Sequence, residues 1–565
     1  MRKIDQVTLS IMVNNLYWTA EEMNEYLAMA AFSTNIKVRR DCSCAIYTKN
    51  GEILAQGEFV PVHLGVMAGV LKEIMKDFLP ETMKPGDVYI TNDPYRMGSH
   101  IFDVMLFKPI FAEGQLIAFT GVLAHHVDIG GAPVTEGCTT CIEEGLRIPP
   151  LKLYDQGVLN ENIYRFFLNN VRTPYEAKGD LAAQTAANYR GEMRILELVE
   201  KYGADMLVDY FEAILDYSEK GMREAIAALP DGESSFEDVV EFDGTSQTTS
   251  HIRTKLIISG DELYFDFTGT SAPTNGSVNA PWGITLAAAY YAVKSVLGNN
   301  IPTNAGAYRP INLIHPTKPS MVDVQYPSPC SLCTTMPSQR IAEVCIGCFS
   351  KIVPEKSCAC DGTWLGTRFV GIDPRTGRFS ALVETYGAGR GAKYNQDGSD
   401  AHQTTMTNTA NAPAEITELE HPLQVLKYGL VENSGGPGKF RGGVGITREM
   451  MTTAEMDIAV TALRPNSQPY GLDGGSGGQS DFCNIELDPD KIVYSKKRTA
   501  AGTKVVIRTS GGGGWGNPLE RDFTAIEADI LEGYVTIAAA KEQYRVVVDP
   551  ATGKVDAEET AKLRT

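Results

Sequence analysis

Hydrophobic and polar positions follow helical spacing in the first part of the chain, with short strand-like runs between. In residues 8–33 apolar side chains recur every three or four positions without Pro or Gly, which predicts a long amphipathic helix. The same spacing predicts helices over residues 66–78 and over most of 176–228. Apolar runs such as DVYIT, VMLFKPIF and LIAFTGVLA are separated by Gly, Asn, Asp and Pro and predict strands.

From about residue 230 the pattern becomes mostly alternating. Segments such as SSFEDVVEF and ELYFDFTG predict half-buried strands, helices are expected around GITLAAAYYAVKSVLG and SQRIAEVCIGCFSKIVP, and the last fifty residues return to a helical pattern. The sequence therefore predicts a mixed α+β, multi-lobed subunit. Its expected parts are an N-terminal α/β region (1–228), an α+β region (229–360), a long Gly-rich and β-rich region (361–520) and a C-terminal helical extension (521–565).

Composition narrows the class of protein. The 565 residues carry a net charge of −19, and no basic stripe appears, which argues against a nucleic-acid surface. The N-terminus lacks a signal-peptide pattern, and no run of about 18 apolar residues predicts a membrane span. We expect a cytoplasmic protein, whose 11 cysteines are reduced thiols or metal ligands rather than disulfides.

Half of the histidines lie close together. Of eight in the chain, four fall between residues 63 and 126: His63, His100, His125 and His126. His100 ends a turn of small residues, and Asp103 opens a strand-like run. If that run pairs with the next one about Glu113-Gly114, His125 comes close to His100 and Asp103. Two imidazoles and one carboxylate suit Zn²⁺, Mn²⁺ or Fe²⁺.

A structural interpretation of these residues stays open. An isolated H-x-x-D also fits a capped turn with a hydrogen-bonded histidine, because so short a motif occurs by chance. Clustering favours the metal site without deciding it. Asp41 and His63 are further candidates, although surface charge or a loop hydrogen bond is the better explanation of each of them from local sequence.

Two other patterns are weaker. Three C-x-x-C pairs resemble a structural zinc site by spacing, but Cys345 and Cys348 fall in an apolar helix, where cysteine packs as a small hydrophobe. The glycine-rich segments GGPGKFRGGVG and SGGGGWG are not Walker A loops and do not clearly join a strand to a helix. Tight turns between strands explain them better. No phosphate loop of an actin-like ATPase occurs, so this chain is not expected to bind ATP by itself.

Several longer segments together resemble the hydantoinase B family. This family includes N-methylhydantoinase B subunits, the second half of ATP-dependent 5-oxoprolinases and the large subunits of acetone and acetophenone carboxylases. The resemblance covers nearly the whole chain and rests on NIKVRRDCSCAIY, PVHLG, NDPYRMGSHIFD, AHHVDIGG, GDLAAQTAANYRG, FDFTGTS, SGGPGKFRGGVG and SGGGGWGNPLERD. Two departures stand out: Met97 and Ser99 occupy positions where glycine and threonine are usual.

The resemblance implies a bound divalent metal. The ligands that it implies are Asp41, His100, Asp103 and His125. His126 and Asp128 are implied close by as catalytic residues, and His126 could replace His125 as a ligand. The ion would be Zn, Mn or Fe. The resemblance also implies a hetero-oligomer, in which a hydantoinase A-type subunit with an actin-like ATPase fold binds ATP and phosphorylates the substrate.

Three functions follow from this resemblance. The first is the metal-bearing subunit of an ATP-dependent cyclic amide hydrolase, in which metal-activated water opens a phosphorylated hydantoin, 5-oxoproline or related lactam. The second is a subunit of an ATP-dependent ketone carboxylase. The third is a non-catalytic partner that stabilises an ATPase subunit. The retained His and Asp set argues against the third function, because a scaffold needs no metal ligands.

Candidate substrate contacts complete the predictions. Asp180, Gln184 and Asn188 are four residues apart and share one helix face, which is either a pocket wall, a packing surface or a solvated face. Arg147 and Arg172 are candidates for anchoring a phosphorylated intermediate, since arginine recognises phosphate well.

Overall fold

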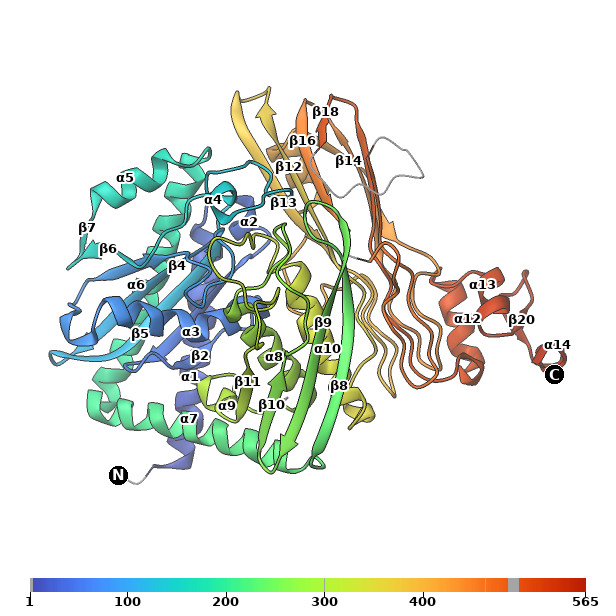
Figure 1. The fold of residues 1–565 in the computed structure, drawn as a ribbon, viewed down its shortest axis with the longest axis horizontal. Helices are drawn as coiled ribbons and strands as arrows, with labels where there is room; N and C mark the ends of the chain where they lie inside the picture. Colours follow the sequence, from blue (N-terminus) through green and yellow to red (C-terminus); the bar gives the residue numbers. More distant parts are fainter. Residues whose placement is uncertain (1–3, 299, 463, 486–496, 565) are drawn as a thin grey trace.

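A computed structural model describes residues 4–298, 300–462, 464–485 and 497–564. The N-terminal region is built on a seven-stranded sheet in the order β2-β1-β5-β4-β3-β6-β7 (Figure 1). Its strands are β1 (Cys42–Thr48), β2 (Ile53–Gln56), β3 (Val88–Thr91), β4 (Asp103–Ala112), β5 (Gln115–His125), β6 (Leu151–Asp155) and β7 (Val158–Leu159). All of its strand pairs are antiparallel. The predicted hairpin of β4 and β5 is therefore confirmed.

Helices cover both faces of this sheet. They are α1 (Gln6–Ala30), α2 (Thr34–Lys37), α3 (Pro61–Asp77), α4 (Cys141–Glu144), α5 (Glu161–Asn169), α6 (Pro174–Tyr202) and α7 (Ala204–Ala227), with the 3-10 turn η1 (Pro80–Thr82). Alternate residues of β1 enter two hydrophobic clusters. Cys44 and Ile46 pack with α1 and α6, whereas Ala45 and Tyr47 pack with α3.

The first helix is shorter than its pattern predicts. Spacing alone carries it to residue 33, but α1 ends at Ala30. Asp180 Oδ1 of α6 accepts hydrogen bonds from the backbone N–H groups of Phe32 (2.8 Å) and Ser33 (3.0 Å). The chain turns there, and Ser33 caps the short helix α2. This turn places α2 beside the end of β5.

A second, four-stranded sheet has the order β11-β10-β9-β8. Its strands are β8 (Gly232–Phe242), β9 (Gln247–Ser259), β10 (Glu262–Asp266) and β11 (Ile311–Ile314), and the accompanying helices are α8 (Trp282–Leu297), α9 (Ala305–Tyr308), α10 (Met336–Ser350) and η2 (Pro354–Lys356). Helix α10 packs on β8 and β9 and contacts α8, which in turn packs on α3. Cys345 and Cys348 of α10 are buried in this core.

The β-rich region has two four-stranded sheets, in the orders β13-β12-β16-β18 and β14-β15-β19-β17. The strands are β12 (Leu365–Asp373), β13 (Arg378–Tyr386), β14 (Leu423–Leu430), β15 (Ile446–Thr452), β16 (Met456–Thr461), β17 (Phe482–Ile485), β18 (Lys497–Thr499) and β19 (Lys504–Arg508). One short helix, α11 (Ala414–Glu420), lies between β13 and β14 in the chain. The long β-rich part predicted from the sequence is thus confirmed.

The glycine-rich segments are packed side by side rather than forming simple turns. A Cβ atom on Gly389 would lie 1.8 Å from the carbonyl oxygen of Gly443, and one on Gly511 would lie 1.8 Å from that of Ser434. Backbone hydrogen bonds connect the segments, such as Gly512 N–H to Gly443 O at 2.9 Å. Only glycine allows backbones to approach this closely.

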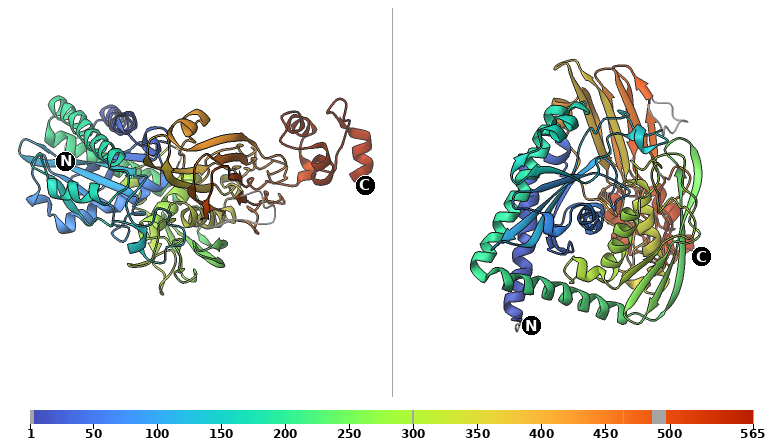
Figure 2. Two further views of the ribbon diagram at one scale, coloured as in Figure 1. Left: turned by 90° about the horizontal axis from the view of Figure 1, so that it is seen from above. Right: turned by 60° about the vertical axis from the view of Figure 1, so that its left-hand side comes forward.

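The C-terminal elements project from the body at the end opposite the N-terminal sheet (Figures 1 and 2). They are η3 (Pro518–Glu520), α12 (Phe523–Leu531), α13 (Ile537–Gln543), β20 (Val547–Val548), β21 (Val555–Asp556) and α14 (Ala557–Arg564), and they have a small core of their own. One large core is shared by the other three parts, so the boundaries at 228, 360 and 520 stay predictions. No helix within the described ranges has the length and apolarity needed to cross a membrane.

Candidate metal centre

The β4–β5 hairpin brings Asp103 and His125 together. Its two-residue turn, Glu113 and Gly114, has positive φ at both positions (52° and 79°), which matches the twist of the two strands. Pairing from this turn places Asp103 directly opposite His125. Directly opposite residues of an antiparallel pair point to the same face of the sheet. The start of β4 and the end of β5 therefore present a carboxylate and an imidazole side by side.

His100 completes this group from the loop before β4. Its Nε2 lies 3.1 Å from Asp103 Oδ1, and its ring lies 4.9 Å from that of His125. The candidate ligand atoms of these three buried side chains all lie within 4.8 Å of one another. Ser99, at the position where the family usually has threonine, uses its hydroxyl to donate a hydrogen bond to Asp103 Oδ2.

The hydrogen bonds of His100 leave one ring nitrogen for a cation. His100 Nδ1 donates to the carbonyl oxygen of Ser331 at 2.7 Å. Nε2 then carries the lone pair of a neutral ring, and it faces the anionic Oδ1 of Asp103. Both atoms are buried and have no hydrogen-bond partner. Two facing acceptors need a shared cation, so the residues present fit a divalent metal ion.

The electrostatics of His125 and Asp103 agree with a metal site, whereas those of His100 also favour a proton shared with Asp103. Burial lowers the pKa of His125 to about 3, so its ring is neutral near neutral pH, which is the form that binds metals. Burial favours protonated Asp103, but His100 and His63 outweigh it and lower the pKa of this carboxyl. Burial also disfavours charged His100, yet neighbouring Asp103 raises the pKa of the imidazole overall.

Asp41 and His63 lie next to the group. His63, at the start of α3, places Nε2 3.6 Å from Asp41 Oδ1 and 3.7 Å from Asp103 Oδ2. The backbone carbonyl of Asp41 accepts a hydrogen bond from His125 N–H at 3.1 Å. Of the four implied ligands, His100, Asp103 and His125 come together directly, and Asp41 joins them through His63.

Short helix α2 orients His125. Asn35 Nδ2 lies 2.9 Å from both His125 Nδ1 and the His125 carbonyl oxygen. Arg39 donates to Asn35 Oδ1, which fixes the orientation of the amide. Sequence reasoning missed both residues, although they stand in the quoted segment NIKVRRD, because neither has a recognisable ligand spacing.

The loop that holds His100 is itself held by a buried acid. Glu144 accepts hydrogen bonds from the backbone N–H groups of Cys330 (3.1 Å) and Ser331 (2.7 Å). Burial raises the pKa of Glu144 to about 7. This contact joins segments nearly two hundred residues apart in the sequence. It fixes the Ser331 carbonyl, which orients His100.

A small cavity of about 60 Å³ adjoins the histidines. Its walls come from four parts of the chain: the N-terminal region, the segment 331–335, strands β12 and β13 with the preceding Trp364, and the segment 407–409. The lining includes Asp41, His63, His100, His125, Glu136, Trp364, Arg368 and Glu384. The candidate centre therefore lies where the N-terminal sheet meets the β-rich region.

His126 and Asp128 lie away from this cavity. His126 follows His125 and points to the opposite face, where its Nε2 donates to Gln184 Oε1 of α6 at 3.0 Å. Asp128 forms an ion pair with Arg172, with Nη2 and Oδ1 2.6 Å apart. The structure thus brings His125, and not His126, to His100 and Asp103.

The predicted substrate contacts are engaged with protein. Gln184 Nε2 donates to the Val104 carbonyl at 2.8 Å, and Asn188 Nδ2 donates to that of Leu106 at 3.3 Å, so this face of α6 packs on β4. Arg147 Nη1 lies 3.0 Å from Asp93 Oδ2, and its guanidinium covers the ring of Tyr326 at 4.4 Å. None of these residues lines the cavity beside the histidines.

Met97 stands at a position where the sequence comparison above expects glycine. Its φ is 62°, in the left-handed region that favours glycine. Its side chain packs against Gly69 of α3, where an added Cβ would come within 2.7 Å of Met97 Cε. Met97 does not line the cavity.

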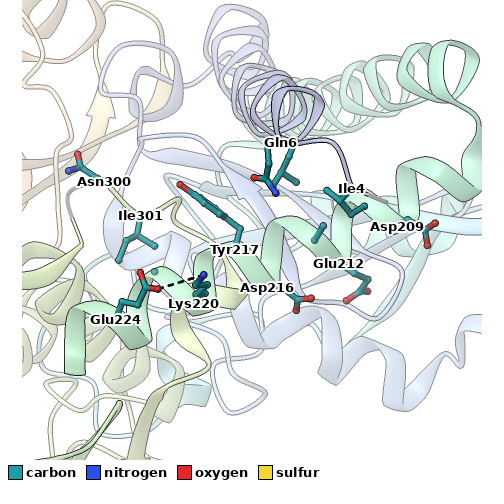
Figure 3. A pocket seen from close by; sticks show the side chains of 13 residues that line it. Ile4, Gln6, Asp209, Glu212, Asp216, Tyr217, Lys220, Glu224, Asn300 and Ile301 are labelled. Atoms are coloured by element: carbon teal, nitrogen blue, oxygen red, sulfur yellow. Dashed lines mark ion pairs between the residues drawn. The ribbon is translucent and has the colours of Figure 1, made fainter. Parts of the chain in front are cut away.

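A larger groove lies elsewhere, between α1, α7 and residues 300–301 (Figure 3). It offers about 750 Å³, and acidic side chains such as Asp209, Glu212 and Asp216 line it. None of the predicted ligands lies there. We therefore choose the candidate centre by its converging imidazoles and carboxylate and not by the size of a groove.

Comparison with known proteins shows the family of this chain. The family model for hydantoinase B/oxoprolinase matches residues 5–518. The chain belongs to this family. The resemblance inferred from the sequence motifs is thereby confirmed.

Two curated relatives show how the family unit occurs in chains of different length. A putative D-/L-hydantoinase B subunit from Pseudomonas sp. (strain NS671) is 32% identical, over 100% of this chain and 98% of its own. The 5-oxoprolinase 1 of Arabidopsis thaliana is also 32% identical, but the match covers 91% of this chain and only 42% of the relative.

Solved structures confirm the fold. The ATP-dependent caprolactamase from Pseudomonas jessenii matches with a TM-score of 0.91 and 28% identity, over all of both chains. A nucleotide-free acetone carboxylase matches with a TM-score of 0.90 over 100% of this chain and 83% of its own. At 20% identity, the second match shows the fold alone.

Proposed function

We propose that this chain is the metal-bearing B subunit of an ATP-dependent cyclic amide hydrolase. Its substrate class is hydantoin, 5-oxoproline or a similar lactam, phosphorylated by a hydantoinase A-type partner with an actin-like ATPase fold. The observation that carries the proposal is the buried group of His100, Asp103 and His125, whose facing Nε2 and Oδ1 atoms lack hydrogen-bond partners. The names of the hydantoinase, 5-oxoprolinase and caprolactamase relatives support the substrate class.

His100, Asp103 and His125 would hold the ion, with Asp41 beside them. A bound Zn, Mn or Fe ion would supply a Lewis acid that acidifies water near the activated amide. The Ser331 carbonyl holds a proton on His100 Nδ1, which keeps Nε2 directed at the centre. His63 Nε2 lies between the carboxylates of Asp41 and Asp103, so a proton on this atom would be held beside the centre for exchange with the reacting groups.

In the proposal, the partner subunit binds ATP and phosphorylates the substrate. Several relatives are named as subunits, and in the Arabidopsis 5-oxoprolinase the matched part is 42% of one longer chain. A second component that phosphorylates the substrate is consistent with both arrangements. We therefore place ATP on the partner and the hydrolytic step on this chain.

Reconstitution with the partner tests the proposal. The complex is expected to open a lactam when ATP and a divalent metal are present, without bicarbonate. Metal analysis of this chain is expected to give about one equivalent, which the double variant His100→Ala/Asp103→Ala loses. Absence of metal from the wild-type chain after loading has been attempted would contradict the hydrolytic mechanism and favour a non-catalytic partner.

A ketone carboxylase subunit is the second candidate function. Its support is the fold shared with acetone carboxylase. Bicarbonate separates the two functions in the same assay: carboxylation of a ketone that depends on ATP and bicarbonate, with no lactam opening, would replace the hydrolase.

A further inference from the structure

One buried arginine differs from all the others that the structure describes. The buried arginines within the described ranges are Arg39, Arg340, Arg368, Arg441, Arg448, Arg464 and Arg521. Six of them hydrogen-bond through their guanidinium groups to a carboxylate, a carbonyl or a hydroxyl. Arg368 is 7% exposed, and no hydrogen bond of its guanidinium group occurs within the described ranges. Its Nε is buried without a partner, as is the Nε of Arg39, Arg448 and Arg464, but those three arginines make other guanidinium hydrogen bonds. An unpaired guanidinium is costly to bury, so this exception calls for an explanation.

Arg368 lies beside the candidate metal centre. It belongs to β12 and lines the same cavity as His100 and His125. Its guanidinium carbon lies 4.6 Å from the centre of the Phe102 ring. Phe102 also stacks on His125, with ring centres 5.4 Å apart and an angle of 8° between the planes. One aromatic ring thus positions both the arginine and a predicted ligand.

A second unused donor lines this cavity. Trp364, which directly precedes β12, is 2% exposed, and its indole Nε1 is buried without a hydrogen-bond partner. Indole N–H groups usually find an acceptor when they are buried. Two donors of different chemical type in one wall indicate that an acceptor belongs in the cavity.

The other charged groups of the cavity wall leave Arg368 uncompensated. Glu384 pairs with Arg448 at 3.3 Å, and Asp41 lies 4.0 Å from Arg39 and near His63. Glu136 also lines the cavity, but it forms no ion pair with Arg368 within 4.0 Å in the part of the chain described. Its own Oε2 is buried without a partner, and so is Oε2 of Glu384, although Oε1 of Glu384 pairs with Arg448. Compensation of the Arg368 charge by Glu136 is therefore the alternative explanation, and the experiment must separate it from anion binding.

We propose that Arg368 and Trp364 form an oxyanion subsite that holds the phosphoryl group of the activated substrate beside His100, Asp103 and His125. Arginine presents a planar fork of donors that binds phosphate through two hydrogen bonds. The phosphoryl assignment rests on the proposed function, whereas the oxyanion subsite itself rests on the unpaired donors. A substrate carboxylate offers the same chemistry, and the test distinguishes the two sources.

The test is calorimetric titration of inorganic phosphate, and separately of acetate, into the full-length chain. Arg368→Met removes the donors and keeps a side chain that packs on Phe102. Phosphate affinity is expected to fall by about tenfold or more, since hydrogen bonds to charged groups are strong, while metal content stays unchanged. Repeating the titration after chelation removes any direct contribution of the ion to phosphate binding.

Two control variants make the result specific. Arg375→Met removes an arginine that pairs with Asp373 at 2.9 Å just after β12, outside the cavity, and is expected to leave phosphate affinity unchanged. Glu136→Gln is expected to keep or strengthen phosphate binding, because it removes a negative charge from the wall. If Glu136→Gln weakened binding as much as Arg368→Met does, the wall would act as an ion pair and the subsite would be overturned.

Thermal unfolding gives a second measure, independent of turnover. Without anion, Arg368→Met is expected to melt at the wild-type temperature or above it, because the variant buries no unpaired charge. Phosphate should raise the melting temperature of the wild type alone. A lower melting temperature, together with unchanged phosphate affinity, would show a structural arginine and overturn the proposal.

The outcomes for the subsite and for the proposed function are separable. Arg368-dependent binding of acetate but not phosphate would overturn the phosphoryl assignment. Failure of the complex to open any lactam would contradict the hydrolase, yet an Arg368-dependent phosphate affinity measured on this chain would still establish the subsite. Lactam opening with no effect of Arg368→Met on phosphate affinity would support the hydrolase and overturn the subsite.

Discussion

The two sides of the β4–β5 sheet bury polar side chains for different reasons. Toward α6, His126, Gln184 and Asn188 each hydrogen-bond to protein and join the helix to the sheet, and the two atoms left without a partner there, His126 Nδ1 and Asn188 Oδ1, belong to side chains that are bonded through their other polar atom. Toward the cavity, His100 Nε2 and Asp103 Oδ1 face each other at 3.1 Å without a hydrogen bond. Buried polar groups that bond to protein stabilise a fold, whereas unpaired groups that converge indicate a ligand.

The largest expected difference separates two adjacent histidines. His125→Ala should lose the metal and reduce lactam hydrolysis by about a thousandfold or more, because it removes one of three converging ligands. His126→Ala should retain the metal and lose stability instead, because it removes the bond to Gln184. Metal analysis and turnover of both variants check this. Metal loss in the His126 variant, with retention in the His125 variant, would reverse the comparison and support the predicted catalytic role of His126.

His421 lies outside the β4–β5 hairpin, and its titration should affect the stability of the protein in acid. Burial lowers the pKa of His421 to about 4, against about 6.5 in an unfolded chain. As the pH falls, the unfolded chain is protonated first, so stability present above pH 6.5 is lost between about pH 6.5 and 4. The loss is about 3 kcal/mol. Urea unfolding between pH 4 and 7 should show a shallower acid limb for His421→Gln. An identical pH dependence in both proteins would contradict the assignment.

Variants at His63 test whether a side chain on the cavity side of the sheet transfers a proton in the reaction. His63→Gln should keep the metal, since the three converging ligands remain, and should lower turnover by about 10- to 100-fold. Turnover with the partner subunit and metal content are measured together. Ser43→Ala, which removes the hydroxyl 3.3 Å from His63 Nδ1, serves as a milder companion variant. Full activity of His63→Gln would show that His63 only fills space between Asp41 and Asp103.

The smallest effect is expected on the α6 side. Gln184→Ala removes hydrogen bonds to His126 and to the Val104 carbonyl, so the free energy of unfolding should fall by about 1 to 2 kcal/mol. Metal content and phosphate affinity should not change. Chemical denaturation with metal analysis checks this. Loss of substrate binding at unchanged stability would instead support the substrate contact predicted for Gln184.

Local sequence determined much of the fold. Regular apolar spacing identified α1, α3, α6, α7, α8 and α10, because a helix buries one continuous stripe of side chains. The Glu113-Gly114 turn between two apolar runs identified the β4–β5 hairpin, and with it the approach of His125 to His100 and Asp103. Each of these features depends on contacts between residues that are close in the sequence.

Only the tertiary structure decided which face each side chain takes and what surrounds it. The choice between His125 and His126 depends on the register of β5 and on α6 covering one face. Arg368 and Trp364 have no local signal, because they reach the histidines only where β12 meets the N-terminal sheet. The Ser331 carbonyl comes to His100 through a loop held by Glu144. Such contacts join distant segments through packing of the whole molecule, which no short pattern of residues encodes.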